Sequence, residues 1–199
     1  MSPKGTALLP SDKEGLYLSG KLLIATPAVQ DSCFNKSVIY MCAHNESGAM
    51  GVIVNQPIEN LHIREIMEQL DIETGDGMRD MPVHFGGPVD SNRGFVLHSG
   101  DVTTEGSLVQ PDGIALTANV AILREMADGK GPQQSLLMLG YAGWASGQLE
   151  SEIESGSWIV VPAVRNLVFE SENEMKWSAA AATLGIDLSR MTTGQVGHA

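Results

Sequence analysis

The sequence predicts an α+β fold built on a mixed, mostly antiparallel sheet. Segments with strand and helix patterns alternate irregularly, and some neighbouring strands are joined by turns too short for a helical crossover. Glycine is frequent, at 22 residues in a chain of 199, which indicates many turns and close backbone approaches. Hydrophobic residues make up 43% of the chain, enough for an ordinary core, so we expect one domain.

The first half of the chain predicts three strands and a helix. Residues 21–26 (KLLIAT) form an apolar run that ends before a proline, as a buried strand does. Residues 37–44 are rich in β-branched and aromatic side chains, and residues 49–57 follow after the short turn NESG, so these two strands should pair antiparallel. Residues 62–70 place apolar side chains at helical spacing.

The second half continues the mixture of strands, turns and helices. Its predicted elements are strands at 82–87 and 94–99, a hairpin over 106–117 around Pro111-Asp112-Gly113, a helix over 117–131 capped by Thr117 or Asn119 and closed by Gly129 or Gly131, a strand at 134–143, a helix over 144–156, a strand at 157–163 and a helix over 172–186. We expect a single domain over 15–187, between a flexible leader (1–14) and a flexible tail (188–199).

Charge and composition exclude several classes of protein. The 12 basic and 24 acidic residues give a formal net charge of −12, and the basic residues are scattered singly, so direct binding to nucleic acid or to an anionic membrane is not expected. The N-terminus lacks a signal-peptide pattern, and the apolar stretch over 16–29 is too short and interrupted to span a bilayer. Cys33 and Cys42 form no CxxC motif and should be reduced thiols, which favours the cytoplasm.

The stretch HFGGPVDSNRGFVLH (84–98) has three interpretations, of which a metal site is the first. In a hairpin centred near Ser91, His84 and His98 would face each other, with Cβ atoms about 4.5–5.5 Å apart. Zinc takes three or four protein ligands, and no third ligand is specified nearby. We therefore expect no metal.

The other two interpretations of this stretch are an anion cradle and a structural turn. The backbone N–H groups of Gly86 and Gly87, with Arg93, could hold an anion. We favour the turn, in which the glycines (Gly94 included) permit a positive φ or close backbone packing. Arg93 would then be held by Asp90 or by backbone carbonyls, and His98 would be buried.

No other segment specifies a catalytic constellation or a cofactor. The glycine-rich turn GYAGWASG (140–147) precedes a helix but is followed by no lysine, and Glu150, Glu152 and Glu154 would repel a phosphate. The chain contains no GxSxG motif, and a solvated helix face explains these three carboxylates better than an acid–base pair does.

Three segments together resemble the bacterial YqgE/AlgH family. They are GKLLIATPAVQDSCFNKSVIYMCAHNESGAMGVIVNQP (20–57), GGPVDSNRGFVLH (86–98) and GYAGWASGQLESEIESGSW (140–158), in the family's order and spacing. The resemblance implies a bifurcated sheet that curls into a pseudo-barrel and is flanked by helices. One branch of the family carries a name tied to transcriptional regulation of alginate synthesis, and the family offers no catalytic residues to carry over.

Two functional hypotheses follow from the sequence. The first is a non-enzymatic cytoplasmic protein that acts through a protein partner, in transcription-related regulation. The alternative is a small-ligand-binding protein or hydrolase with a polar site around His44, Asn55, Arg93 and His98, because polar residues gather at strand ends in the matched segments. A protein that contacts DNA directly is a third reading, which the net charge disfavours.

Overall fold

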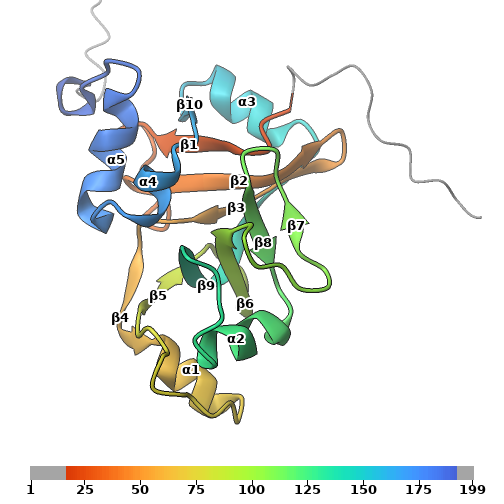
Figure 1. Ribbon diagram of the computed structural model, residues 1–199. Coiled ribbons are helices and arrows are strands. Elements are labelled where there is room, and N and C mark those ends of the chain that lie inside the picture. The colour runs from red at the N-terminus through yellow and green to blue at the C-terminus, as the bar shows by residue number, and fades with distance from the viewer. Residues whose placement is uncertain (1–16, 192–199) are drawn as a thin grey trace, which may run out of the picture.

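A curled, mixed sheet organises residues 17–191, the part of the chain that the computed structural model describes (Figure 1). Its strands within that part are β1 (Lys21–Ala25), β2 (Val38–Asn45), β3 (Gly48–Ile53), β4 (Pro57–His62), β5 (Pro82–Phe85), β6 (Val89–Ser99), β7 (Leu108–Val109), β8 (Ile114–Thr117), β9 (Ser135–Ala145) and β10 (Trp158–Pro162). The main path runs β10-β1-β2-β3-β9-β6-β8-β7, with antiparallel neighbours throughout. The expected mostly antiparallel α+β architecture is confirmed.

The sheet divides at β9, which makes it bifurcated. The C-terminal part of β9 pairs with β3, while its N-terminal part pairs in parallel with β5, and β4 then adds to β5. In Figure 1, β1, β2 and β3 lie across the top of the view, whereas β6 and β8 run steeply below them. The sheet therefore curls, as the right-handed twist of its strands requires over so many neighbours.

Five α-helices of the described chain cover this sheet, and a 3-10 turn follows them. They are α1 (Ile63–Gln69), α2 (Val120–Ala127), α3 (Gln148–Glu154), α4 (Arg165–Phe169), α5 (Asn173–Ala182) and η1 (Leu188–Arg190). Figure 1 places α1 and α2 together at the lower end, α3 beside β10 and above β1, and α4 and α5 beside the β1–β3 part. None of the helices within residues 17–191 has the length and apolar character needed to cross a bilayer.

The predicted elements are present, most of them shorter than their sequence patterns. The β2–β3 and β7–β8 hairpins are antiparallel as expected, and α2 is capped by Asn119, whose Oδ1 accepts a hydrogen bond from the N–H of Ala121. The third strand was expected to reach residue 57 but ends at Ile53, and β4 begins at Pro57. β4 escaped prediction because most of its side chains are exposed and lack strand alternation.

The chain ends fall partly outside the described residues. The expected leader (1–14) and the tail beyond residue 191 lie there. Within the described part, Leu188 of η1 is buried in the core cluster beside α4 and α5. The packed structure therefore continues a few residues past 187.

The expected hairpin between His84 and His98 is wrong, because β5 and β6 do not pair with each other. Both pair with the same residues of β9, so they occupy its two opposite edges. His84 lies beside Met138, and His98 lies beside Ser135. The described residues contain no cluster of three or more potential metal ligands.

Gly86 and Gly87 explain how the chain passes from one edge of β9 to the other. A Cβ on Gly86 would lie 2.3 Å from the carbonyl oxygen of Gly140, and one on Gly87 would lie 2.1 Å from the carbonyl carbon of Tyr141. Gly87 also has φ of +150°. The predicted structural role is confirmed for these two glycines. The nearest atom to a Cβ on Gly94 would be 4.0 Å away, so Gly94 carries no such constraint.

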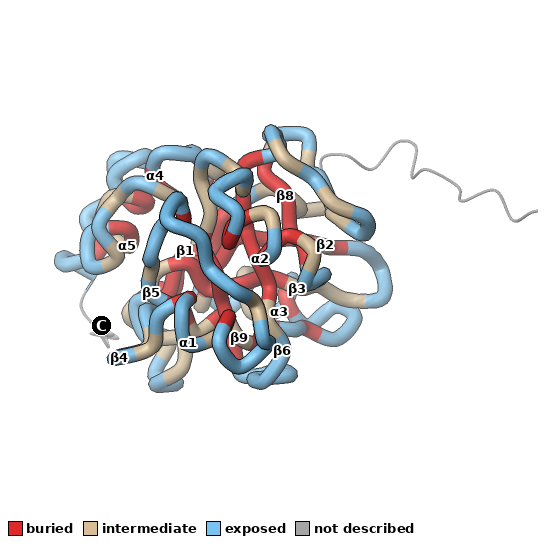
Figure 2. The backbone as a smooth tube through the Cα atoms, turned by 60° about the horizontal axis from the view of Figure 1, so that its bottom comes forward, coloured by how far each residue is buried: buried red, intermediate tan, exposed pale blue. Residues whose placement is uncertain are grey.

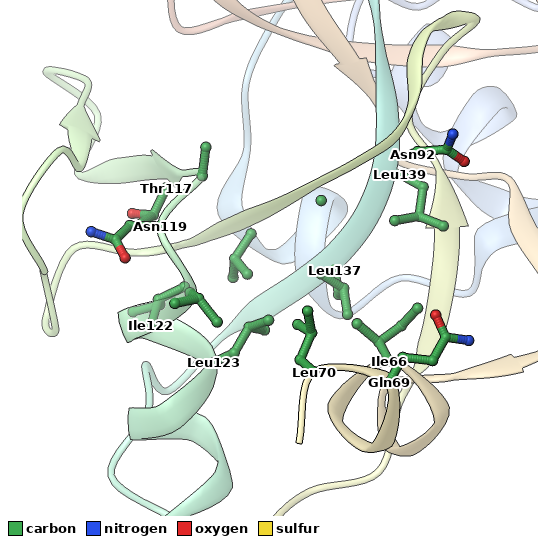
Figure 3. Close-up of a pocket in the computed structure, with 14 residues that line it drawn as sticks. Ile66, Gln69, Leu70, Asn92, Thr117, Asn119, Ile122, Leu123, Leu137 and Leu139 are labelled. Atoms are coloured by element: carbon green, nitrogen blue, oxygen red, sulfur yellow. The ribbon is translucent and has the colours of Figure 1, made fainter. Parts of the chain in front are cut away.

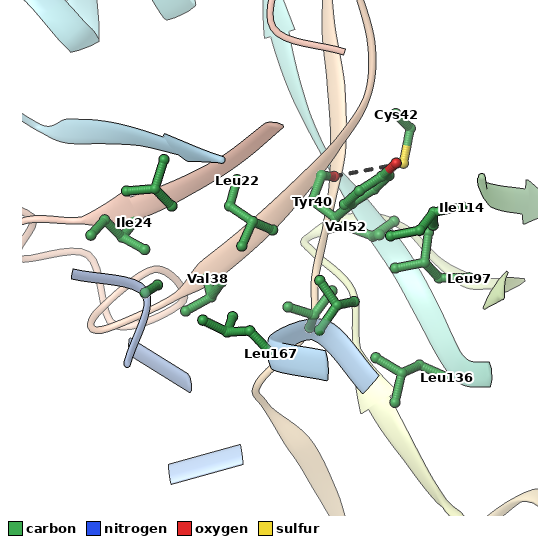
Figure 4. Packing of buried hydrophobic residues seen from close by; sticks show 14 of the residues in the cluster. Leu22, Ile24, Val38, Tyr40, Cys42, Val52, Leu97, Ile114, Leu136 and Leu167 are labelled. Atoms are coloured by element: carbon green, nitrogen blue, oxygen red, sulfur yellow. Dashed lines mark hydrogen bonds between the residues drawn. The ribbon is translucent and has the colours of Figure 1, made fainter. Parts of the chain in front are cut away.

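Buried residues are concentrated in the strands at the centre of the molecule (Figure 2). One cluster joins β1–β3 to α4 and α5, and Figure 4 shows Leu22 and Val38 near Leu167 of α4. A second cluster lies under α1 and α2, and a third under α3 includes Trp144 and Trp158. The apolar core is therefore divided into three clusters, of which the first also includes residues of β6, β8 and β9.

Candidate functional site

The four residues proposed from the sequence lie at separate places in the fold. Asn55 accepts a hydrogen bond from the N–H of Val38 at the start of β2, whereas His44 lies near the other end of that strand. Arg93 and His98 are five residues apart along β6, so about 16 Å separates their backbones in extended chain. The structure does not bring these four side chains into one polar site.

His44 connects β2 to the segment before β1 and to α3. Its Nδ1 accepts a hydrogen bond from the N–H of Leu18 at 3.1 Å, so its Nε2 carries the proton and donates to Glu150 Oε1 at 2.8 Å. The backbone N–H of Glu150, followed by the His44 contact, holds the pKa of the Glu150 carboxyl below its usual value. Both ring nitrogens are therefore used within the fold.

Asn55 and Arg93 differ in the contacts that their side chains make within the fold. Asn55 bridges two backbone groups, because its Oδ1 accepts from Val38 N at 2.9 Å and its Nδ2 donates to Lys36 O at 2.9 Å. Arg93 is exposed where β6 loses its register with β9, and its guanidinium lies 5.2 Å from the centre of the Phe95 ring. The expected bond from Arg93 to Asp90 or to backbone carbonyls is absent from the described chain, so that expectation is wrong.

His98 is fully buried, as predicted, and it takes part in a chain of hydrogen bonds. Its Nδ1–H donates to the carbonyl of Ser99 at 2.8 Å, so Nε2 accepts from the Thr117 hydroxyl at 2.8 Å. The Ser107 hydroxyl then donates to Thr117 at 2.6 Å. Burial, chiefly, lowers the pKa of His98, which keeps the ring neutral near pH 7.

A groove between α1 and α2 is the concave feature that this network reaches, since Thr117 lines it. The groove has a volume of about 500 Å³, and its floor comes from β6 and β9 (Figure 3). Its middle is apolar, with Leu70 directly after α1, Leu123 of α2 and Leu137 of β9 close together. Its ends carry polar groups, which are Thr117 and Asn119 at one end and Asn92 and Gln69 at the other.

The groove is held in shape by the starts of its two helices. α1 begins with a capping box between His62 and Glu65, and α2 begins at the Asn119 cap. Apolar side chains continue from the groove onto the surface, because Leu70 is 48% exposed and Val120 is 36% exposed. None of the lining residues is ionisable, so the groove offers no acid, base or charged ligand for chemistry.

Sequence patterns could predict the helices of this groove but not the groove itself. Leu70 and Leu123 each continue the apolar spacing of their own helix. Such spacing shows which face is apolar and says nothing about whether a second helix covers it. The neighbouring strands and the branch at β9 decide that.

The side-chain amine of Lys176, in α5, is buried and does not line the groove. Lys176 of α5 is fully buried, and its Nζ donates to the carbonyl of Val54 at 2.8 Å. Loss of hydration lowers the pKa of Lys176 to about 8, with a smaller opposing effect from Glu172. His84 is also buried, and burial, together with the nearby Lys176 charge, lowers its pKa against the effect of its bond to Asn173. These groups pack inside the fold and line no described hollow.

Comparison with known proteins gives a consistent result over nearly the whole chain. A family described as AlgH-like matches residues 22–189. A UPF0301 protein of Rhodospirillum rubrum is 44% identical over 92% of this chain and 95% of its own length, and one of Jannaschia sp. is 47% identical over the same shares.

Two solved structures show the same fold. The solution structure of the AlgH protein from Pseudomonas aeruginosa is 38% identical, covers 96% of this chain and all of its own, and has a TM-score of 0.76. A crystal structure from Corynebacterium diphtheriae, 21% identical, covers 89% of this chain and 92% of its own with a TM-score of 0.69.

Proposed function

The chain belongs to the AlgH-like family, and we propose that it is a non-enzymatic binding protein that acts through a protein partner. The partner places the apolar face of an amphipathic helix in the groove between α1 and α2. One observation carries this proposal, namely a groove without ionisable groups whose apolar lining continues into the exposed side chains of Leu70 and Val120.

The exposed rim favours a protein helix over a ligand that is confined to the hollow. A helix bound in a groove contributes apolar side chains at every third or fourth position and extends beyond the hollow at both ends. A helix of that length would also cover the exposed parts of Leu70 and Val120. Because the chain has a net charge of −12, a helix with basic residues beside its apolar face would also associate faster.

The other described polar groups do not favour catalysis. The ring nitrogens of His44 and His98 and the amide of Asn55 are used in internal hydrogen bonds, and Arg93 stacks on Phe95. The family resemblance implies a role in transcriptional regulation. On this proposal the protein would influence transcription indirectly, through the protein partner that it binds. The charge of the chain disfavours direct contact with DNA.

A small, mostly apolar ligand in the same groove is a second candidate. Volumes of roughly 300–1,000 Å³ with an apolar lining and few polar groups are typical of small-molecule sites. The amides of Asn92 and Gln69 at one end of the groove would orient such a ligand. Of the sequence-derived residues, His98 would contribute through Thr117.

Affinity capture with matched variants tests the proposal. Leu70→Glu and Val120→Glu place a charge in the groove, and Met175→Glu, on the 58% exposed Met175 of α5, is the control. A partner retained by the wild type and the control but lost by both groove variants supports the proposal. The partner is then purified and its binding segment is synthesised, and the segment should gain helical circular dichroism on binding.

The same experiment separates the alternatives. All three changed positions are exposed, so each variant should keep the melting temperature of the wild type. Retention of the partner by the groove variants would contradict the proposal. A small molecule that co-purifies with the wild type and is lost from both groove variants, with no protein lost, would establish the second candidate instead.

A further inference from the structure

A second hollow lies at the other end of the curled sheet and shares no residue with the groove. It has a volume of about 340 Å³ and is formed by the segment after β1, the end of β9, α3 and the start of β10. In Figure 1 this region lies around α3, at the opposite end of the molecule from α1 and α2. Its role can therefore be tested independently of the proposed function.

Aromatic rings are concentrated around this hollow. Two of the chain's three tryptophans, Trp144 and Trp158, line it together with Phe34. Trp158 meets Phe34 edge to face, with ring centres 5.8 Å apart, and it meets Trp144 in the same way at 6.0 Å. Rings held nearly perpendicular present faces in different directions, and the face of an aromatic ring attracts cations.

A carboxylate is fixed among these rings without a compensating charge. Glu152 Oε2 accepts hydrogen bonds from the indole N–H groups of Trp144 and Trp158, each at 2.8 Å, and Oε1 accepts from Gln148 at 2.9 Å. All three donors are neutral, so they orient the carboxylate and leave its negative charge in place.

A second carboxylate lines the same hollow. Asp31 accepts a hydrogen bond from the N–H of Cys33 at 2.8 Å, which is also a neutral donor. Between residues 17 and 191, no lysine, arginine or histidine forms an ion pair with Asp31 or Glu152. The nearby Lys36 lies over Trp177 instead, 5.5 Å from the ring centre.

We propose that this hollow binds an organic cation, an alkylammonium or guanidinium group, between the rings of Phe34, Trp144 and Trp158 and the carboxylates of Asp31 and Glu152. Ring faces and carboxylates attract the same kind of group, and neither carboxylate is paired with a basic side chain within residues 17–191. An anion would be repelled by two carboxylates, and a purely apolar ligand would leave them desolvated and unpaired. A cation satisfies both features.

Indole N–H signals in NMR give a direct test with an internal control. Choline is titrated beside its uncharged isostere 3,3-dimethylbutan-1-ol, at constant ionic strength. Choline should shift the Trp144 and Trp158 signals saturably at roughly millimolar concentration, as a site built on a few cation–π contacts would. The Trp177 indole donates to the Ala25 carbonyl elsewhere, and its signal should not move.

Charge-removing variants make the test specific. Glu152→Gln should weaken choline binding about tenfold, and Asp31→Asn should weaken it too while keeping the acceptor for Cys33. Glu154→Gln, an exposed change on the same helix outside the hollow, should leave binding unchanged. Asp31 is exposed, so its variant remains informative if Glu152→Gln unfolds the protein.

A second arm of the test identifies the source of the cation. The same groups are presented as lysine, trimethyllysine or arginine side chains in short glycine peptides. Tighter binding of a peptide than of the free cation would assign the site to a protein chain, and equal binding would assign it to a free amine. An equal response to 3,3-dimethylbutan-1-ol, or unchanged choline binding in both variants, would overturn the proposal.

Discussion

Replacing Gly87 by alanine should destabilise the fold more than any ordinary glycine substitution. Gly87 has φ of +150°, which a residue with a Cβ adopts only under strain of about 1 kcal/mol or more. A Cβ at this position would also lie 2.1 Å from the carbonyl carbon of Tyr141 and 2.2 Å from its oxygen. Ordinary contacts between such atoms are about 3.5–4.0 Å.

The clash cannot be relieved cheaply, because the atoms in the way belong to the backbone of β9. Tyr141 itself pairs with Val89 of β6, so moving it breaks the ladder on that side. Overpacking costs about 1–3 kcal/mol even where side chains can adjust. With the backbone strain added, we expect Gly87→Ala to lower the free energy of unfolding by about 3 kcal/mol or more.

Thermal unfolding of three matched variants would isolate the cause. A loss of about 3 kcal/mol corresponds to a fall in Tm of roughly 6–12 °C for a domain of this size. Gly106→Ala keeps the strain without the clash, since φ is +83° and nothing lies within 4 Å, so it should cost about 1 kcal/mol. Gly94→Ala has neither and should cost nothing measurable. A Gly87→Ala variant as stable as Gly106→Ala would refute the crossing of β9 described above.

Four further predictions concern charge. Burial lowers the pKa of Lys176 from 10.5 to about 8, so between these values the unfolded chain binds a proton that native Lys176 has lost, and this lysine adds stability as the pH rises. Burial raises the pKa values of Cys42 and Tyr40, which opposes that gain above about pH 9. In denaturant unfolding, the stability of the wild type relative to Lys176→Met should therefore rise from pH 8 to about 10.5. Arg93→Ala should lower stability by no more than about 1 kcal/mol, because Arg93 is exposed and its guanidinium contacts only the ring of Phe95 within the described chain. A larger loss in the same assay would mean that Arg93 bonds within the fold. Fluorescence anisotropy should detect no duplex DNA complex tighter than micromolar at physiological salt, and a specific complex that survives competitor DNA would make the regulatory role direct. Elemental analysis of protein purified without added metal should find no stoichiometric zinc, and zinc that resists mild chelation would reveal a site that His84 and His98 do not form.

Local patterns in the sequence predicted most elements because the forces behind them are local. The β-branched and aromatic side chains in residues 37–44 suit a buried strand, and the helical spacing in 62–70 reflects which face of that helix is buried. Turn residues and the Asn119 cap fixed where several elements begin. The structural role of Gly86 and Gly87 was also predictable, because glycine permits a positive φ and close backbone packing.

Pairing between distant segments could not be predicted in the same way. The chain from 82 to 99 contains two strands and a short connection, which is also the pattern of a hairpin. β9, about 40 residues later, inserts between the two strands and separates His84 from His98. His44 and Asn55 bond to Leu18 and Val38, which lie 26 and 17 residues away in the sequence, so spacing alone suggested a polar site that the fold does not assemble.

The hollows depend on contacts that no single segment specifies. The groove needs α1 and α2 on one layer of β6 and β9, and the aromatic hollow needs α3 against the segment that follows β1. Each of these pairs is separated by 50 residues or more in the sequence. The sequence showed which residues are apolar or aromatic, but it could not show that they come together to line these two hollows.

Photo-crosslinking from inside the groove tests the central claim most directly. A benzophenone amino acid replaces Leu70 in one variant and Met175, on the far helix α5, in another, and both are irradiated in native extract. We predict one dominant protein adduct from position 70 that is absent from position 175, attached through a segment with an amphipathic helical pattern and basic flanks. Identical adducts from both positions, or no protein adduct from position 70, would contradict the account.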